Sequence, residues 1–579
     1  MPRSLLPRND IDFLIHDWLG GELAVDREIV DAILDVSERI ARERFLPLFK
    51  RTDVEEPVLG PDGVEVCPGI ADALKSYAEV GLFGASFPEE LGGLGLPNLV
   101  CTASFAMVAA ASVAVAAYPM LTTGNARLIS KFGSPAQVDA FCRPQVDGRW
   151  FGTMCLSEPQ AGSSLADIRT RAVADGADGL GARYRLTGNK MWISGGDHNL
   201  SENIVHLVLA KIPQEDGQLP EGTAGISLFI VPKFLPDGSR NDVVVAGLNH
   251  KMGYRGTSNC LLNFGESQGA QGWLVGEPGA GLRQMFMMMN EARVGVGTGA
   301  AALGYRGYRL SANYARERLQ GRPIGTRSGS PIAIIEHPDV KRMLLQQKAY
   351  SEGALALCFY CARLIDLAED DAQSASLLGL LMPVVKTWSS EFGLASNDIA
   401  IQIHGGYGYT RDFDVEQLWR DNRLNPIHEG TTGIQGIDLL GRKILPDRQA
   451  VEILGAAISA TADGAREVPE LTPFNAPLQQ AWDQAMAVVS ALPTDQRAFD
   501  NATVFLRAFG HIVVAWLWLD QAVAAARLKA QGAGDLDLVE GKLHACRYFF
   551  EHELPQVPPM LSIVGSGSDV ASSAPARIF

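Results

Sequence analysis

A carboxylate in the stretch Asn425–Gln435, NPIHEGTTGIQ, is the best-placed candidate for chemistry in this sequence. Pro426 lies shortly before Glu429 and Gly430 follows it directly, so the sequence predicts an irregular connection here and not a helix interior. A helical pattern ends before this stretch, and another begins near Thr432, with Thr431 or Thr432 as its N-cap. A carboxylate between two helices, beside a glycine that lets a ligand approach, is a candidate general base. The alternative is a loop glutamate in water.

Two glycine-rich stretches offer backbone N–H groups that could bind a pyrophosphate or a carbonyl edge. EPQAGSS (Glu158–Ser164) follows a predicted strand, and HGGYGYT (His404–Thr410) follows a predicted helix. Each stretch is alternatively an ordinary turn. The sequence has neither a GxGxxG motif after a strand nor a GxxxxGK[ST] motif, so neither a Rossmann nor a P-loop nucleotide site is indicated.

Two apolar stretches are candidates for contact with a flat or flexible ligand. Trp192 and Ser194 are two residues apart in a predicted strand and so are expected on one face, where they could flank a flat heterocycle. FMMMNEAR (Phe286–Arg293) is rich in methionine, which adapts to flexible apolar ligands. The alternatives are a core tryptophan and an ordinary bundle core. Cys358 and Cys361 form a lone CxxC in a helical segment, so no metal centre is predicted.

Composition sets the broad class of protein. A chain of 579 residues is too long to fold around a single hydrophobic core, so two to four domains are expected. The net charge of −16 argues against a nucleic-acid partner. The N-terminus does not read as a signal peptide, and the apolar runs Val108–Met120 and Ile512–Leu519 are too short to span a bilayer, so no membrane span is expected. Eight cysteines without framework spacing favour a reducing, cytoplasmic location.

Periodicity indicates the elements that must position these residues. Helices are expected over Asp26–Lys50, Gly69–Val80, Leu99–Ala117, Thr122–Phe132, Leu282–Ala315, His337–Leu367, Ser376–Ile403, Pro493–Ala533 and Asp537–Leu554. From Trp150, short β-branched and aromatic runs between Gly, Asn and Pro turns predict an antiparallel β-domain. The predicted fold is mostly α with a middle β-domain. Its segments are a helical arm (1–22), an α-domain (23–149), the β-domain (150–279), a helical bundle that carries Glu429 (280–447) and an additional helical domain (448–579).

Taken together, these stretches resemble the acyl-CoA dehydrogenase flavoprotein family. The resemblance is carried, in the family's order, by CLSEPQAGSS, LTGNKMWISGG, KMGYRGTSNC, EARVGVGTGAAALG and QIHGGYGYTRDFDVEQLWRDNRLNPIHEGTTGIQ. It implies the family's fold, which is an α-helical domain, an antiparallel β-domain and a four-helix bundle, here followed by a C-terminal helical domain. The arm and the extension are similar to the larger bacterial subfamily of 3-methylmercaptopropionyl-CoA dehydrogenases and broad-range fatty acyl-CoA dehydrogenases.

The resemblance also implies a cofactor, FAD, and the residues that hold it. Leu156 and Ser157 would meet the pyrimidine edge of the flavin and Ser163 its pyrophosphate. Trp192 would pack beside the isoalloxazine ring, and Ser194 would hydrogen-bond near N5. Thr431 would also approach the cofactor. The adenosine-diphosphate half would be contacted by residues that typically come from the neighbouring subunit, namely Arg318, Gln402, Gly405 and Gly406.

For the substrate, the resemblance implies an acyl-CoA and the role of Glu429 as the base that removes its α-proton. The β-hydrogen would leave as hydride to the flavin, giving a trans-2-enoyl-CoA in fatty acid β-oxidation. Substrate contacts would come from Ser163, Met289, Asn290, Arg293, His428 and Gly430. His428 departs from the family, in which many members carry tyrosine, and this leaves the chain-length preference open.

The implied partners are an electron-transfer flavoprotein as electron acceptor and a second copy in a homodimer. Tetrameric members pack bundle against bundle, and the extension could cover that surface within one chain. Two alternatives remain open from the sequence. One is an acyl-CoA oxidase that passes electrons to oxygen, and the other is a flavin- and DNA-binding relative with little dehydrogenase activity, which the net charge of −16 disfavours.

Overall fold

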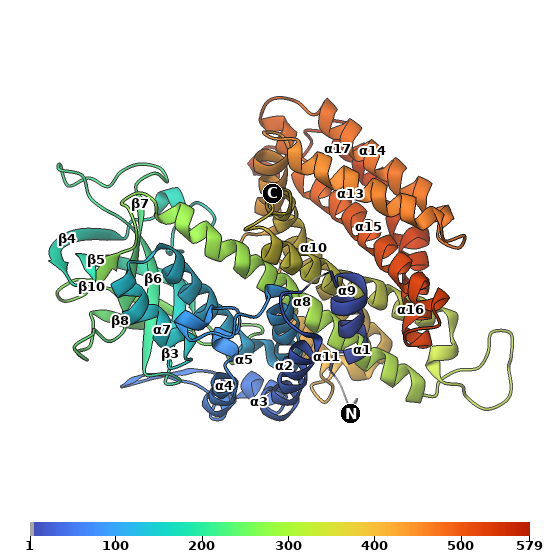
Figure 1. Cartoon of the computed structure of the whole chain (residues 1–579), viewed down its shortest axis with the longest axis horizontal. Coiled ribbons are helices and arrows are strands. Elements are labelled where there is room, and N and C mark those ends of the chain that lie inside the picture. Colours follow the sequence, from blue (N-terminus) through green and yellow to red (C-terminus); the bar gives the residue numbers. More distant parts are fainter. Residues whose placement is uncertain (1–4, 22) are drawn as a thin grey trace. The chain divides into compact units, whose positions relative to one another are not determined.

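The computed structural model describes residues 5–21 and 23–579, which form two compact units. The first unit comprises Met1–Ala24, Asn98–Ala106 and Val296–Phe579; the second comprises Val25–Pro97 and Met107–Gly295. Two long helices, α5 (Asn98–Phe132) and α8 (Gly281–Glu317), contribute residues to both units (Figure 1). Residues 1–4 and 22 of the predicted arm lie outside the described residues, and the boundaries of the five predicted segments stay predictions.

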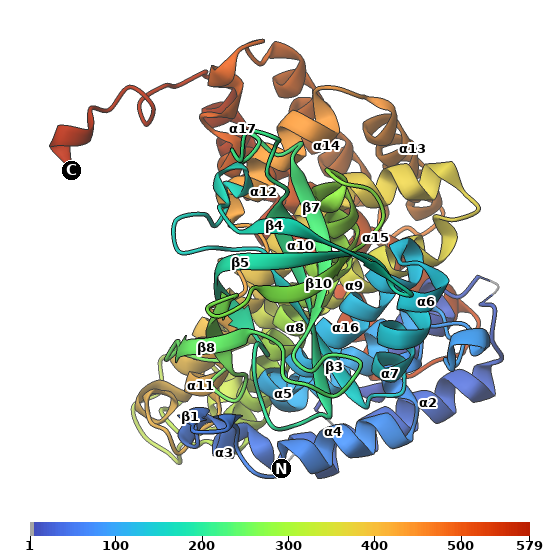
Figure 2. The same ribbon diagram turned by 90° about the vertical axis from the view of Figure 1, so that its left-hand side faces the viewer.

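The second unit contains an eight-stranded sheet. Its path runs β10-β7-β6-β4-β5-β9-β8, with β3 also paired to β6. Strand β10 pairs with both β7 and β5, and Figure 2 shows β5 between β4 and β10. The strands are β3 (Trp150–Cys155), β4 (Arg171–Asp178), β5 (Gly181–Ser194), β6 (Asn203–Lys211), β7 (Ile226–Pro232), β8 (Val243–Leu248), β9 (Asn259–Phe264) and β10 (Ala270–Leu274).

The sheet is mixed, so the prediction of an antiparallel β-domain was wrong in this respect. Strand β3 runs parallel to β6 from the Trp150–Asn203 pair to the Cys155–Val208 pair, and β4 meets β6 in a parallel bridge. Nearly every residue of β3 and β6 is buried or half-buried. Continuous apolar runs are typical of strands covered on both faces, and such runs carry no information on strand direction.

The helices of the second unit depart from the predicted boundaries at two places. Asp26–Lys50 is not one helix, because α2 (Arg27–Ile40) passes into a π-helical turn at Ala41–Phe45 and α3 (Leu48–Val54) begins after Pro47. The opposite error occurs in α5, because the two predicted helices Leu99–Ala117 and Thr122–Phe132 form one helix. The chain stays helical through Pro119 and leaves helical geometry only at Ser112. The other elements are β1 (Val58–Gly60), β2 (Gly63–Glu65), α4 (Ile70–Glu79), α6 (Pro135–Gln137) and α7 (Arg143–Val146).

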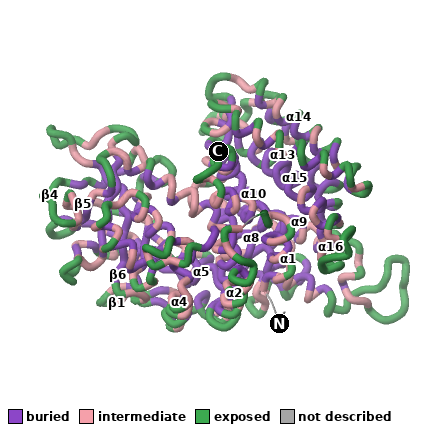
Figure 3. Tube along the Cα trace, viewed as in Figure 1, coloured by how far each residue is buried: buried purple, intermediate pink, exposed green. Residues whose placement is uncertain are grey.

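The first unit is helical, and its long helices α9 and α10 pack against each other with mostly buried residues (Figure 3). Asp371 caps α10 by accepting hydrogen bonds from the backbone N–H groups of Gln373 and Ser374. The helices are α1 (Arg8–Asp12), α9 (Pro338–Leu367), α10 (Ala372–His404), α11 (Val415–Asn422), α12 (Thr432–Asp438), α13 (Gln449–Arg466), α14 (Asn475–Ala491), α15 (Ala502–Ala530), α16 (Leu536–Tyr548) and α17 (Val557–Gly565).

The C-terminal extension is built around α15, beside which α13, α14 and α17 lie (Figure 1). The prediction that this helix begins at Pro493 was wrong. A short 3-10 turn at Gln496–Phe499 precedes it, and α15 begins at Ala502. Both α5 and α15 are long and apolar enough to cross a membrane by length and composition, although 83% of the apolar window of each is buried, as in core helices of soluble proteins.

A buried charge cluster joins the N-terminal arm to the bundle and to the extension within the first unit. The ammonium of Lys542 on α16 contacts Asp10 of α1 at 2.5 Å and Glu352 of α9 at 3.1 Å. Tyr305 donates a hydrogen bond to Asp10 at 2.7 Å, and Lys348 pairs with Glu352. Lys542, Asp10 and Glu352 are almost wholly buried, so the cluster depends on its internal pairing.

Candidate active site

The segment that carries Glu429 lies between α11 and α12 of the first unit and has an unusual backbone. Glu429 has φ 54° and Gly430 has φ 90°, so both occupy the left-handed region, which is uncommon for a residue with a side chain. Thr431 caps α12, its side chain accepting from the N–H of Ile434 at 3.5 Å, which resolves the predicted choice between Thr431 and Thr432. The irregular connection predicted from Pro426 and Gly430 is confirmed.

Two buried side chains fix the peptide groups on either side of this turn. Gln435 donates from Nε2 to the carbonyl oxygen of Glu429 at 2.9 Å, and Lys386 donates from Nζ to the carbonyl oxygen of Gly430 at 2.7 Å. Neither Gln435 nor Lys386 has measurable exposure. The Glu429 side chain therefore extends from a backbone held at both carbonyls. Sequence reasoning missed Lys386, because it lies in the middle of α10, far from the motif in sequence.

A ladder of buried asparagines leads to His428. Asn422 donates to Asn397 at 2.7 Å, Asn425 donates to Asn422 at 2.9 Å, and His428 Nε2 meets Asn425 Oδ1 at 3.1 Å. The amide nitrogen of Asn425 is already used as a donor, so Asn425 Oδ1 is the acceptor and His428 Nε2 carries the hydrogen that it donates. Burial, with a smaller effect of the Lys386 charge, lowers the pKa of His428 to about 3, so the ring is neutral at pH 7.

Residues predicted to meet the adenosine-diphosphate half gather on one exposed region of the first unit. The guanidinium of Arg318 lies over the ring of Tyr407 at 5.7 Å from its centroid. Arg318, Gln402, Gly405 and Gly406 are all exposed, and a methyl group on Gly405 or Gly406 would meet no atom within 4 Å. The structure thus brings the predicted arginine to the glycine-rich stretch that follows α10.

In the second unit, a buried ion pair anchors the loop that follows β3. The carboxylate of Glu158 contacts Lys190 Nζ at 2.9 Å and accepts from Thr170 Oγ1 at 2.6 Å and from Arg169 N–H at 2.7 Å. Burial by itself would raise the pKa of Glu158, but the Lys190 charge and these hydrogen bonds outweigh it and hold the pKa below its usual value. Sequence reasoning missed this pair.

The same lysine connects the loop to β5. Lys190 Nζ also donates to the carbonyl oxygen of Leu156 at 2.9 Å, and the N–H of Met191 donates to the carbonyl oxygen of Ser157 at 3.0 Å. Leu156 and Ser157 are half-buried, whereas Ser163 is exposed farther along the loop. The polar edge of residues 156–157 is therefore held against the strand that carries Trp192.

Trp192 lies at a bulge of β5. Its φ is 64°, the pairing with β9 shifts register between Lys190 and Ile193, and 58% of the residue is exposed. The bulge interrupts the regular pairing of β5 at this point, and the shared face of Trp192 and Ser194 stays a prediction. Ser194 is half-buried and accepts from Asn259 Nδ2 at 3.2 Å. An exposed indole on a strained backbone is suited to stacking on a flat ring.

The methionine-rich start of α8 belongs to the second unit. Met288 is buried and packs against Gly124 of α5, where an added methyl group would lie 3.2 Å from its Cε. Met289 is half-buried at the edge of the same core. Arg293 donates to Asn290 Oδ1 at 3.3 Å, so two predicted substrate residues contact each other. Nearby, Glu291 pairs with Arg127 at 3.0 Å, and burial raises the pKa of this carboxyl.

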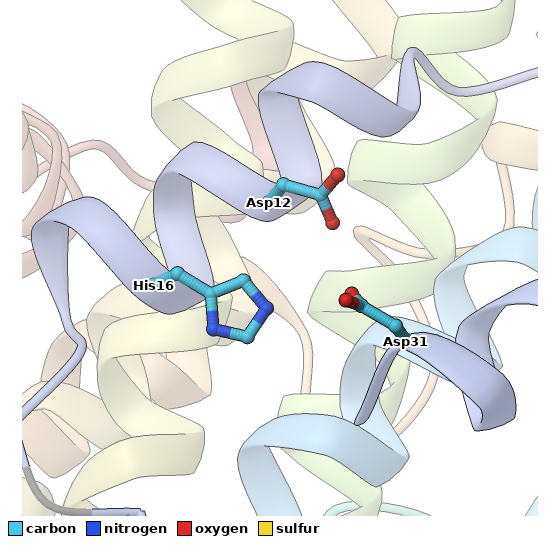
Figure 4. A group of neighbouring side chains, drawn as sticks. All are labelled: Asp12, His16 and Asp31. Carbon is cyan, nitrogen blue, oxygen red and sulfur yellow. The ribbon is translucent and has the colours of Figure 1, made fainter. Parts of the chain in front are cut away.

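Two aspartates and a histidine near the N-terminus are of the types that bind metal ions. Asp12 and His16 project from one side of the arm in the first unit, and Asp31 projects from α2 in the second (Figure 4). Asp12 pairs with Arg8 at 2.7 Å and Asp31 with Arg27 at 3.8 Å, each within its own segment. Since both carboxylates already have a cationic partner, we assign no metal to these residues.

A helical bundle with a glutamate on a fixed backbone turn, and a sheet with an exposed indole beside a polar loop, are features of a flavin-dependent dehydrogenase. Family models agree with this class along the chain. They match as acyl-CoA dehydrogenase N-terminal domain at residues 31–149, middle domain at 153–266 and C-terminal domain at 279–445, and as acetyl-CoA dehydrogenase C-terminal like at 454–575. The chain belongs to the acyl-CoA dehydrogenase family and is an oxidoreductase.

Several relatives extend over nearly the whole chain. A 3-methylmercaptopropionyl-CoA dehydrogenase of Ruegeria pomeroyi is 36% identical over 542 residues, covering 90% of each chain. A broad-specificity linear acyl-CoA dehydrogenase of Mycobacterium tuberculosis is 34% identical over 559 residues, covering 91% of this chain and 90% of the relative. The structure of an acyl-CoA dehydrogenase of Bacillus anthracis complexed with FAD superposes with a TM-score of 0.76 at 21% identity, covering 96% of this chain and 91% of that one.

The cofactor of this family is FAD, and the residues present fit it. In the second unit, the exposed Trp192 indole offers an apolar face, and the loop that begins at Leu156, held by Lys190, offers a polar edge. In the first unit, Arg318 and the open glycines at Gly405 and Gly406 offer a cation and free backbone beside it. A flat heterocycle and a pyrophosphate need these two kinds of surface.

Proposed function

We propose that the protein oxidises an acyl-CoA thioester to the trans-2-enoyl-CoA, with Glu429 as the base. The observation that carries this proposal is the backbone of the stretch Asn425–Gln435, which contains Glu429 and is called the base segment below. Glu429 and Gly430 have left-handed φ values, and the carbonyl oxygens of both are held by buried donors, Gln435 and Lys386. A strained residue that its surroundings hold in place is typical of a catalytic site.

The residues of this chain have separate tasks in the proposed reaction. Glu429 removes the α-proton of the thioester, and the N–H of Glu429 donates to the thioester carbonyl, where negative charge develops. FAD, when bound, supplies the acceptor for the β-hydrogen, which leaves as hydride. Trp192 and Ser194 orient that cofactor from the sheet. Arg318, Gln402, Gly405 and Gly406 would bind its adenosine-diphosphate half from a neighbouring subunit, and Thr431 would also approach the cofactor.

Substrate contacts are proposed for Ser163, Met289, Asn290, Arg293, His428 and Gly430. Because its pKa is lowered to about 3, His428 stays neutral and cannot form an ion pair with the carboxylate beside it. The substrate class is an acyl-CoA, as in the named relatives from Ruegeria pomeroyi and Mycobacterium tuberculosis. We propose an electron-transfer flavoprotein as the acceptor, while the homodimer and the cytoplasmic location stay predictions.

The test is anaerobic bleaching of the bound flavin by butanoyl-, octanoyl-, hexadecanoyl- and 3-methylmercaptopropionyl-CoA. The wild-type protein is expected to bleach with at least one of them. Glu429→Gln is expected to retain flavin and to bleach at least about 100-fold more slowly. Glu416→Gln on α11, which removes a carboxylate paired with Arg420 at 2.7 Å, is the control and should bleach at the wild-type rate.

Retained bleaching in Glu429→Gln would show that another group takes the proton. Aerobic turnover that yields stoichiometric peroxide would identify an oxidase instead of a dehydrogenase.

A further inference from the structure

The first turn of α15, in the C-terminal extension, packs backbone to backbone on α12, the helix that directly follows the base segment. A methyl group on Gly436 would lie 2.8 Å from the carbonyl oxygen of Ala502 and 3.0 Å from the N atom of Thr503. One turn farther along, a methyl group on Gly441 would lie 3.0 Å from the ring of Phe499. Only residues without a side chain allow this approach, so the position of α12 depends on the extension.

A polar chain makes a second connection between the same two helices. Thr432, the first residue of α12, donates to Glu391 Oε1 of α10 at 3.1 Å. Arg507 of α15 donates to the other oxygen, Oε2, of the same carboxylate at 2.9 Å. The extension thus holds the carboxylate that receives the Thr432 hydroxyl, and Thr432 lies three residues after Glu429.

The third connection runs through α10. The indole of Trp388 packs on Gly510 of α15, where an added methyl group would lie 2.8 Å from Cδ1. A short stretch of α10, residues 386–391, therefore has three separate contacts. Lys386 holds the Gly430 carbonyl, and Trp388 contacts the extension. Glu391 binds both Thr432 and Arg507. Helix α15 supports both elements that fix the base segment.

We propose that the C-terminal extension positions the base for proton abstraction, with Gly436 and Arg507 as positioning residues. This inference rests on the proposed role of Glu429. Displacement of a catalytic group by about 1 Å, even from a distant substitution, can slow a reaction by about 100-fold. A helix packed directly against α12 is therefore able to control the rate without touching substrate.

Gly436→Ala is the main test. The added methyl group would push α12 away from Ala502, so we expect flavin bleaching by octanoyl-CoA or the best substrate of the panel to slow at least about tenfold, with KM changed less than about threefold. Amide hydrogen exchange in the peptide that spans residues 425–438 should become faster. Gly464→Ala in α13 is the matched control. Its added methyl group would lie no closer than 3.8 Å to its nearest neighbours, Arg527 and Val523, so this variant should change neither the bleaching rate nor the exchange.

Arg507→Met provides an independent test that should not prevent folding, because 54% of the side chain is exposed. It removes the guanidinium that holds Glu391, and we expect bleaching to slow by roughly two- to fivefold, with a partial return in Arg507→Lys. The effects of Arg507→Met and Thr432→Val should be less than additive, since both break the same chain.

Wild-type bleaching rates and unchanged exchange at residues 425–438 in both Gly436→Ala and Arg507→Met would overturn the inference. If Gly436→Ala does not fold, Arg507→Met decides alone. Failure of the wild-type protein to bleach with any acyl-CoA would instead reject the proposed function. In that case the exchange measurement still tests whether the extension holds the segment.

Discussion

The ammonium of Lys386 donates to the carbonyl oxygen of Gly430 at 2.7 Å, so a wholly buried cation lies beside the peptide that joins Gly430 to Thr431. A lysine in the interior is costly unless it is hydrogen-bonded. Its bond to a main-chain carbonyl keeps the left-handed turn at Gly430 in one conformation, and its charge helps to keep His428 neutral. One side chain of α10 therefore influences the backbone and the electrostatics of the base segment together.

Replacement of this lysine should affect stability and rate at once. Lys386→Met leaves the Gly430 carbonyl without its donor, and we expect the free energy of unfolding to fall by about 1–3 kcal/mol. Flavin bleaching should slow by roughly tenfold because the turn at Glu429 loosens. Denaturant unfolding and stopped-flow bleaching measure the two effects. Lys341→Met, at an exposed lysine of α9, is the control, and equal behaviour of the two variants would contradict the assigned role.

Trp192 should contribute to cofactor affinity and little to the stability of the apoprotein. Trp192→Gly removes a residue that is 58% exposed and relieves its φ of 64°, so the unfolding free energy of the apoprotein should stay within about 1 kcal/mol of wild type. FAD affinity, measured by flavin fluorescence titration, should fall roughly tenfold.

Tyr254 gives the matched contrast, since it also has a positive φ, 50°, but is only 7% exposed. Tyr254→Gly should therefore destabilise the apoprotein by about 3 kcal/mol or more. A Trp192→Gly apoprotein as unstable as Tyr254→Gly, with unchanged FAD affinity, would show that the indole is structural.

Acid should destabilise the second unit through buried histidines. Burial lowers the pKa of His206 to about 3, and its Nδ1 lies 2.8 Å from Thr153 Oγ1. In the unfolded chain His206 becomes protonated near pH 6.5, whereas in the native state it becomes protonated only near pH 3. The contribution is therefore absent above pH 6.5, and below it the unfolding free energy falls by up to roughly 1.4 kcal/mol per pH unit, down to about pH 3.

The corresponding experiment is denaturant unfolding at several pH values between 4 and 7. His206→Asn keeps a polar group near the threonine and cannot be protonated, so its stability should depend less steeply on pH than that of the wild type. His250→Asn, at a histidine whose side chain is 78% exposed, is the control. A wild-type slope in His206→Asn would mean that other groups cause the acid sensitivity.

The sequence predicted the local features of this protein better than the long-range ones. Pro426, Gly430 and the threonines identified the irregular base segment and its cap because their backbone preferences act within a few residues. The direction of β3 against β6 was not predictable in this way, since buried strands have the same pattern in either direction. Two helices, Leu99–Ala117 and Thr122–Phe132, were predicted where the structure has the single helix α5, which stays helical at Pro119.

Residues that act through distant partners were the ones missed. Lys190 and Lys386 look like ordinary helix or strand lysines in sequence, and only the fold brings them to Glu158 and Gly430. The bulge at Trp192 likewise depends on pairing with β9. The composition of a motif thus predicted the irregular backbone around Glu429, whereas the groups that hold this backbone come from elsewhere in the chain.

The buried contact between Asp10 and Lys542 also constrains the order in which the chain can be completed. During synthesis Asp10 is made long before Lys542, which lies in α16. Until α16 has emerged, the carboxylate of Asp10 has no ammonium partner, and burying it alone would be costly. The arm is therefore expected to reach its final buried position only once α16 is available to receive it.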